Sequence, residues 1–162
     1  MSVLRERLFP AVGYASKVVS PKINLPILSN LLLTASTENY LSIESSNLEL
    51  SVRLKIPAKV TEAGQVTVPA KKFAEYLSLI SDEAIELSDD KKNLSVVSPH
   101  NRALFVTMPT NDFPELPKRS DSATRSIIAP AVFRQMARQL VFAASGSDAH
   151  PVLAGVWLEF AK

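Results

Sequence analysis

The chain of 162 residues contains no cysteine and only two histidines, His100 and His150. Without cysteine it can form no disulfide scaffold, no thiolate metal site and no cysteine nucleophile. Two histidines so far apart in the chain are also a poor basis for a metal site. Glycine is scarce as well, and its four copies are isolated, so there is no Gly-rich phosphate-binding loop. We therefore expect neither a metal nor a cofactor.

Long apolar runs are missing too. Runs such as Leu31–Leu33 are far too short to span a bilayer. The first 20 residues lack the charged start, apolar stretch and small-residue cleavage site of a secretion signal. These absences predict a cytoplasmic protein with no membrane partner. The composition, 46% hydrophobic and 21% charged, is that of a folded protein.

Catalytic groups are equally scarce. Ser145, Asp148 and His150 have the residue types of a hydrolytic triad, but they lie in one short loop. Triad partners normally converge from separated elements, so the sequence does not favour this site. His100 is expected to be a lone exposed histidine in a turn. We therefore expect a protein that is not an enzyme.

Two parts of the chain share one pattern of apolar residues. Residues 5–19 and 130–144 both have the i, i+3, i+4, i+7 spacing of an amphipathic helix, and Pro10 is expected in the first turn of the earlier one. The motif Pro26-Ile27-Leu28-x-x-Leu31-x-Leu33 then recurs as Pro151-Val152-Leu153-x-x-Val156-x-Leu158. Because both features recur after 125 positions, we predict a repeated unit of strand, helix, loop and strand, with an incomplete second copy.

The residues between the two copies favour strands. Alternating apolar and polar residues predict antiparallel strands at 41–43, 48–54, 65–68, 84–87, 94–97 and 102–108, with a second helix over 70–81. The stretch 109–122 contains three prolines and no periodicity, and is the expected boundary between domains 1–117 and 118–162. The predicted fold class is α+β, in which each unit has two helices packed on antiparallel sheet.

Charge is distributed unevenly over these elements. The three helical stretches, with the tail of the first to Lys22, sum to +6, whereas the rest of the chain sums to −4. Basic helices and acidic strands predict that the helices face a polyanion and the sheets face water.

Several short motifs carry a resemblance to a known family. They are Leu25-Pro26-Ile27-Leu28-x-Asn30, Ser46-Asn47-Leu48-Glu49-Leu50, Thr67-Val68-Pro69-Ala70-Lys71-Lys72-Phe73, Met108-Pro109-x-x-Asp112-Phe113-Pro114 and Asp148-x-His150-Pro151-Val152-Leu153-x-Gly155. In this order they resemble the bacterial sliding clamp, the beta subunit of DNA polymerase III. The resemblance implies a DNA-clamp fold with three domains per chain and a ring of two chains around double-stranded DNA. It also implies a replication processivity factor whose partners are DNA polymerase III and a clamp loader.

The resemblance assigns candidate site residues. Lys22 matches a basic residue of the family that touches DNA, and Ser147 is its equivalent in the second copy. Lys17 and Arg138 are further candidates to line the hole. Pro151 and Val152 fall where some clamps have aromatic DNA contacts, but here we expect them in the core. The edge that meets the partner chain is matched by Lys72, Arg102 and Phe105.

Two interpretations remain open at this stage. Three units at the observed period need about 375 residues, so the chain would be the amino-terminal part of a clamp. The alternative is a stand-alone clamp-like interaction domain that does not encircle DNA and binds protein through the 102–108 edge. The predicted strand 152–160 has no partner strands and no proline or cluster of charges to protect its edge, which favours a partial clamp.

Overall fold

The computed structural model describes residues 1–19, 25–117, 126–146 and 150–160. The chain divides into two compact units, 1–117 and 118–162. No helix in the described ranges is long and apolar enough to cross a membrane. Each unit is considered by itself below.

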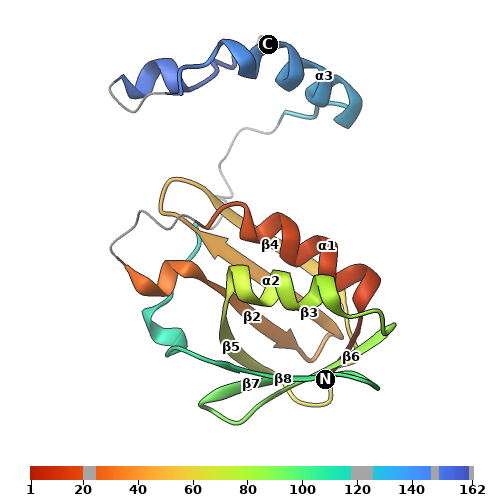
Figure 1. Ribbon diagram of the computed structural model, residues 1–162. Helices are drawn as coiled ribbons and strands as arrows, with labels where there is room; N and C mark the ends of the chain where they lie inside the picture. Colours follow the sequence, from red (N-terminus) through yellow and green to blue (C-terminus); the bar gives the residue numbers. More distant parts are fainter. Residues whose placement is uncertain (20–24, 118–125, 147–149, 161–162) are drawn as a thin grey trace. The chain divides into compact units, whose positions relative to one another are not determined.

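Unit 1 contains two four-stranded sheets in which every pairing is antiparallel. In spatial order, the first sheet consists of β1 (Ser2–Leu4), β6 (Ala84–Asp89), β7 (Asn93–Val97) and β8 (Arg102–Val106). The second consists of β4 (Ser51–Pro57), β3 (Tyr40–Ser46), β2 (Asn30–Ser36) and β5 (Gly64–Pro69). The order leaves β8 and β4 as edge strands of their own sheets. In Figure 1 the strands β2, β3 and β4 lie behind the two helices, and β7 and β8 lie below them.

Two helices, α1 (Arg5–Ser16) and α2 (Ala70–Leu79), lie side by side in unit 1 (Figure 1). Arg5 Nε donates to the Leu77 carbonyl at 3.2 Å, and Ser16 Oγ donates to the Ala70 carbonyl at 3.3 Å. The start of α1 is therefore next to the end of α2, so the helices are antiparallel.

One hydrophobic cluster joins the helices to both sheets. Its fully buried members include Leu8, Val12, Leu31, Ile43, Phe73, Leu77 and Ile85. They come from α1, α2, β2, β3 and β6, which confirms the predicted α+β class with two helices packed on antiparallel sheet. Burial of this apolar surface is the main favourable contribution to the stability of the unit.

Two local predictions in unit 1 are wrong. Pro10 lies inside α1 and not in its first turn, because the helix begins at Arg5. The strand expected over 48–54 begins only at Ser51. Asn47 Oδ1 accepts the backbone N–H groups of residues 49 and 50, and Leu48 has a φ of 71°. This asparagine-stabilised turn provides an alternative to strand pairing.

Unit 2 repeats part of unit 1 at the predicted offset. The helix α3 (Pro130–Leu140) starts 125 positions after the start of α1. A short 3₁₀ helix, η1 (Pro26–Ser29), precedes β2, and η4 (Pro151–Ala154) begins 125 positions later. A further 3₁₀ turn, η3 (Val141–Ala143), follows α3.

The strand predicted over 152–160 does not form: the first residues belong to η4 and residues 156–160 are irregular. In unit 1 the equivalent strand, β2, lies between β3 and β5 and bonds to both. The described residues of unit 2 contain no such neighbours. Because a strand's backbone groups require a neighbouring strand, the apolar pattern alone does not produce one.

Candidate nucleic-acid interface

The exposed face of α1 carries a stripe of polar and aromatic side chains. Arg7 and Tyr14 lie on this face, and Lys17 caps the end of the helix. Lys17 Nζ lies 5.6 Å from the centroid of the Tyr14 ring, which is 63% exposed. Arg7 Nε is 3.5 Å from a carboxylate oxygen of Glu6, and both side chains are well exposed. Surface pairs of this kind are weak, so the Arg7 charge stays accessible to solvent.

The antiparallel packing brings Lys17 to the beginning of α2. Ser16, its neighbour, bonds to Ala70, and Lys71 and Lys72 follow Ala70 as exposed residues of the first turn of α2. The amino-terminal turn of a helix also carries a partial positive charge. Lys17, Lys71 and Lys72 therefore lie together where α1 ends and α2 begins. This is the most basic part of the two helices in unit 1.

In unit 2, Arg134 and Arg138 are exposed on α3. They are four residues apart and therefore lie on the same side of the helix. No acidic residue occurs in α3. The helices of both units thus present basic side chains to solvent.

The resemblance also singled out Lys22, Ser147 and Val152. Lys22 and Ser147 lie outside the described residues. Val152, expected in the core, is 90% exposed. It belongs to η4, and the described residues of unit 2 contain no sheet that could cover it.

The three residues predicted for the partner edge lie on α2 and β8. Lys72 and Arg102 are exposed. Phe105 is half-buried, because its ring centroid lies 5.5 Å from that of Phe73 and 5.7 Å from that of Tyr76, both in edge-to-face geometry. Phe105 therefore forms part of the core of unit 1 as well as part of its edge.

The sequence reasoning missed two residues at this edge. Leu104 is 63% exposed and Val106 is 73% exposed, on the opposite side of β8 from Phe105. Side chains alternate along a strand, so residues 104 and 106 are expected on the same side as the charged Arg102. This alternation could have identified Leu104 and Val106 as exposed. Exposed apolar side chains on an unpaired edge strand indicate a surface for a partner.

The turn before β8 contains a polar cluster. Asp82 accepts hydrogen bonds from Ser98 Oγ at 2.6 Å and from Asn101 Nδ2 at 3.1 Å. His100 Nδ1 lies 2.7 Å from the other carboxylate oxygen of Asp82. His100 is exposed as predicted, but it is not a lone histidine. Its partner is 18 residues earlier in the chain, a pairing that local sequence does not reveal.

The hydrogen bonds from Ser98 and His100, with a smaller contribution from Asn101, hold the pKa of Asp82 well below its usual range. The unfolded chain then binds a proton more readily than the folded chain does. The stabilisation is complete above the unfolded pKa of about 3.9 and is lost as pH falls toward the folded pKa. We expect Asp82→Asn to lower the melting temperature most at pH 5–7, with a difference that narrows below about pH 4.

Thermal unfolding followed by circular dichroism over pH 3–7 measures this difference. Asp112→Asn is a matched control, because Asp112 is exposed and the described residues give its carboxylate no hydrogen bond. If the difference in melting temperature between the wild type and Asp82→Asn stays constant down to pH 3, the lowered pKa of Asp82 is contradicted.

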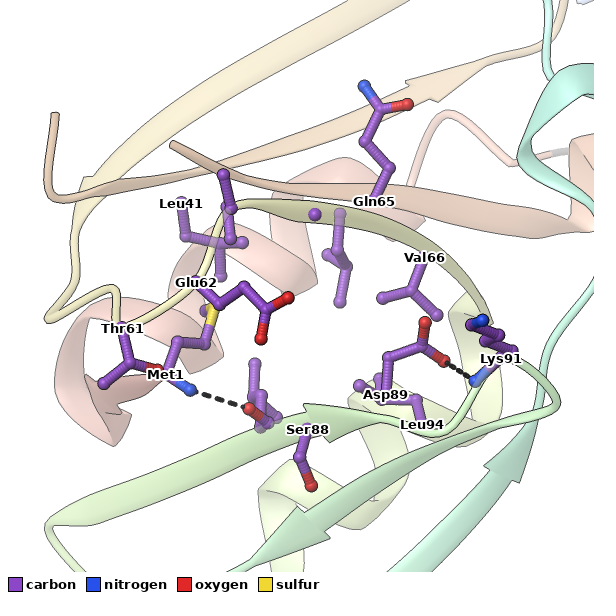
Figure 2. A pocket seen from close by; sticks show the side chains of 15 residues that line it. Met1, Leu41, Thr61, Glu62, Gln65, Val66, Ser88, Asp89, Lys91 and Leu94 are labelled. Atoms are coloured by element: carbon purple, nitrogen blue, oxygen red, sulfur yellow. Dashed lines mark hydrogen bonds between the residues drawn. The ribbon is translucent and has the colours of Figure 1, made fainter. Parts of the chain in front are cut away.

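A cavity of about 330 Å³ lies between the two sheets of unit 1 (Figure 2). On β2, the side of the strand that carries the buried Leu31 and Leu33 carries the smaller Ala35 further along. Ala35 is paired with Gly64 of β5, and these two small residues leave space at this end of the two strands. The apolar part of the lining includes Leu33, Leu41, Val66, Leu87 and Leu94. None of the predicted site residues lines the cavity.

The described residues show no cluster of histidine and acidic residues that could hold a metal. Of the three residues with the chemistry of a triad, Asp148 lies outside the described ranges. The backbone N–H of Ser145 donates to the Leu153 carbonyl at 2.8 Å, which ties the loop to η4.

Comparison with known proteins places these features in a family. Residues 1–117, the whole of unit 1, match the family model described as the DNA polymerase III beta subunit, N-terminal domain. The chain belongs to the DNA polymerase III beta subunit family. This confirms the resemblance drawn from the sequence motifs.

Relatives and solved structures agree with this membership. The chain is 31% identical to a beta sliding clamp of Streptomyces coelicolor over 97% of its own length and 41% of the relative's. It is 33% identical to that of Micrococcus luteus, over 98% and 50%. A DnaN sliding clamp from Pseudomonas aeruginosa has a TM-score of 0.83 at 27% identity, covering 92% of this chain and 40% of that one. The Caulobacter crescentus pol III beta structure gives 0.82 at 27%, covering 91% and 40%. The chain thus spans half or less of the length of these relatives.

Proposed function

We propose that the chain is the amino-terminal part of a sliding clamp, a processivity factor that encircles duplex DNA as a ring and tethers DNA polymerase III during replication. The observation that carries this proposal is the match of all of unit 1 to the family's N-terminal domain. The recurrence of α1 and η1 as α3 and η4, at one offset, supports residues 118–162 as the start of the central domain.

The proposed DNA-facing surface is the helix layer. A clamp must hold DNA and still slide, which requires attraction to phosphates without base readout. Lys17, Lys71, Arg134 and Arg138 offer exposed cations on helices, whereas the described residues contain no aromatic ladder for stacking on bases. Lys22 and Ser147 remain predictions of the same surface.

The remaining parts of the proposal concern partners. The β8 edge with Lys72, Arg102, Phe105 and the exposed Leu104 would meet the partner chain of the ring. The clamp loader and DNA polymerase III would bind the complete protein. We propose that the protein is non-catalytic and cytoplasmic. The family's role as an accessory subunit supports a non-catalytic protein. The replication process that the family serves supports a cytoplasmic location.

The DNA-binding surface is tested by titrating the chain with two short duplexes of unrelated sequence at several salt concentrations. Each lysine that neutralises a phosphate contributes about 1 to the slope of log K against log salt. We expect Lys17→Ala/Lys71→Ala to lower the slope by about 2 and to weaken binding to both duplexes equally.

Lys55→Ala is the matched control, because Lys55 is an exposed lysine on β4, outside the helix layer. It should leave the slope unchanged. If the double variant and the control behave alike, or if one duplex is strongly preferred, the helix layer is not the DNA-facing surface.

A further inference from the structure

The edge strand β8 is held at both of its ends by buried or shielded polar groups that lie far away in the sequence. At its start, Asp82 bonds to Ser98, His100 and Asn101, and the strand begins at the next residue, Arg102. The side chain of Asp82 is only 7% exposed. We name this group of hydrogen bonds the Asp82 anchor.

The turn itself is closed by backbone hydrogen bonds that the Asp82 anchor reinforces. The N–H of Ser98 donates to the Asn101 carbonyl at 2.8 Å, and the N–H of Asn101 donates back at 3.3 Å. Asp82 belongs to the segment between α2 and β6, so the anchor fixes the β7–β8 turn to that segment. The position of Arg102 is therefore set by a carboxylate outside its own hairpin.

The other end of β8 is held by Thr67 of β5, in the second sheet. Thr67 Oγ1 donates to the Met108 carbonyl at 2.8 Å and accepts from the Met108 N–H, also at 2.8 Å. It also accepts from Asn30 Nδ2 at 3.3 Å. Thr67 is fully buried. We name this group the Thr67 anchor.

Between the anchors, β8 bonds on one side only. Its ladder runs to β7 from Arg102 to Val106, and no strand of the described chain pairs with its other side. An edge strand with an exposed apolar face frays easily unless its ends are fixed. Two anchors from separate elements hold this strand in the extended form that a further strand needs for pairing.

We propose that Asp82 and Thr67 are positioning residues for ring closure: they pre-order β8 so that it accepts the edge of a second copy of the clamp. This inference rests on the proposed ring function. Pre-ordering a binding segment lowers the entropy that association must remove, so loss of an anchor weakens association beyond any loss of stability.

The test compares association with stability in the product of the complete gene. Ser98→Ala removes one donor to Asp82, and Thr67→Val removes the hydroxyl of the other anchor with little change in shape. We expect each to weaken self-association about tenfold, measured by analytical ultracentrifugation. Ser98→Thr keeps the hydroxyl and should restore most of the affinity.

Arg53→Ala is the control for stability alone. It breaks the pair in which Arg53 Nε lies 2.8 Å from Glu44 Oε1, on strands β3 and β4 of the other sheet. It should lower the melting temperature and leave the self-association constant unchanged. If the anchor variants change association no more than Arg53→Ala does at an equal loss of melting temperature, the positioning role is overturned.

Amide hydrogen exchange in the 162-residue chain separates this inference from the ring proposal. Loss of the Asp82 anchor should accelerate exchange in the first half of β8, and loss of the Thr67 anchor in the second half, by about tenfold each. A complete gene product that stays monomeric, together with these local effects in the 162-residue chain, would overturn the ring and keep the pre-ordering of β8. If amide exchange in β8 is the same in the anchor variants as in the wild type, the pre-ordering is overturned, whether or not the complete protein self-associates.

Discussion

Truncation of Phe73 to alanine is expected to lower the free energy of unfolding of unit 1 by about 3–5 kcal/mol. Phe73 is fully buried in α2 and packs edge-to-face on Phe105. Its removal leaves a cavity at the point where α2 meets the first sheet, and the surrounding side chains can refill it only in part. Urea denaturation followed by far-ultraviolet circular dichroism measures the change.

Leu79→Ala is the control on the same helix. Leu79 is 83% exposed, so its truncation should change stability by no more than about 0.5 kcal/mol. Similar losses for the two variants would mean that the hydrophobic cluster does not dominate the stability of unit 1.

Replacing Leu104 by aspartate is expected to weaken self-association of the complete gene product about 30- to 100-fold, because a charge would enter the apolar centre of the proposed ring interface. Leu104 is more suitable than Phe105 for this purpose. Phe105 packs on Phe73 and Tyr76, so a charge there would also damage the core. Leu104 points away from these rings and is 63% exposed.

Leu50→Asp makes the same substitution at a leucine that is 55% exposed in the turn before β4. It should leave self-association unchanged. A Leu104→Asp protein that associates as tightly as the wild type would remove β8 from the interface, and the melting temperatures of both variants show whether each one is folded.

Local periodicity was sufficient to predict most of the fold. The helical spacing around Leu8 and Phe73 located α1 and α2. Alternation located β3, β5, β6, β7 and β8, and β4 apart from its start. These patterns work because one face of each element is buried in the shared cluster. The repeat was also visible, since α3 and η4 begin 125 positions after α1 and η1.

The errors arose where structure depends on distant residues. Residues 156–160 have a strand's pattern but no neighbouring strand in the described part of unit 2, so they stay irregular. Val152 was expected in a core that the described residues of unit 2 do not build. His100 was expected to be alone because Asp82 is brought to it only by the packing of the α2–β6 segment.

The candidate interface was predictable only in part. Charge counting found the basic helices, but the grouping of Lys17 with Lys71 and Lys72 follows from antiparallel packing of α1 and α2. The resemblance drew attention to β8, but it did not separate the half-buried Phe105 from the exposed Leu104. Both distinctions require tertiary structure, which decides which side of an element is covered.

We propose that this chain is the beginning of a three-unit clamp, and the coding sequence downstream of the Lys162 codon is the sharpest test of that proposal. We expect an open frame of about 210 further codons, with a third copy of the helix and Pro-x-Leu motif one period after the copy that starts at Pro130. A stop codon directly after Lys162, in a gene read without sequencing error, would contradict it.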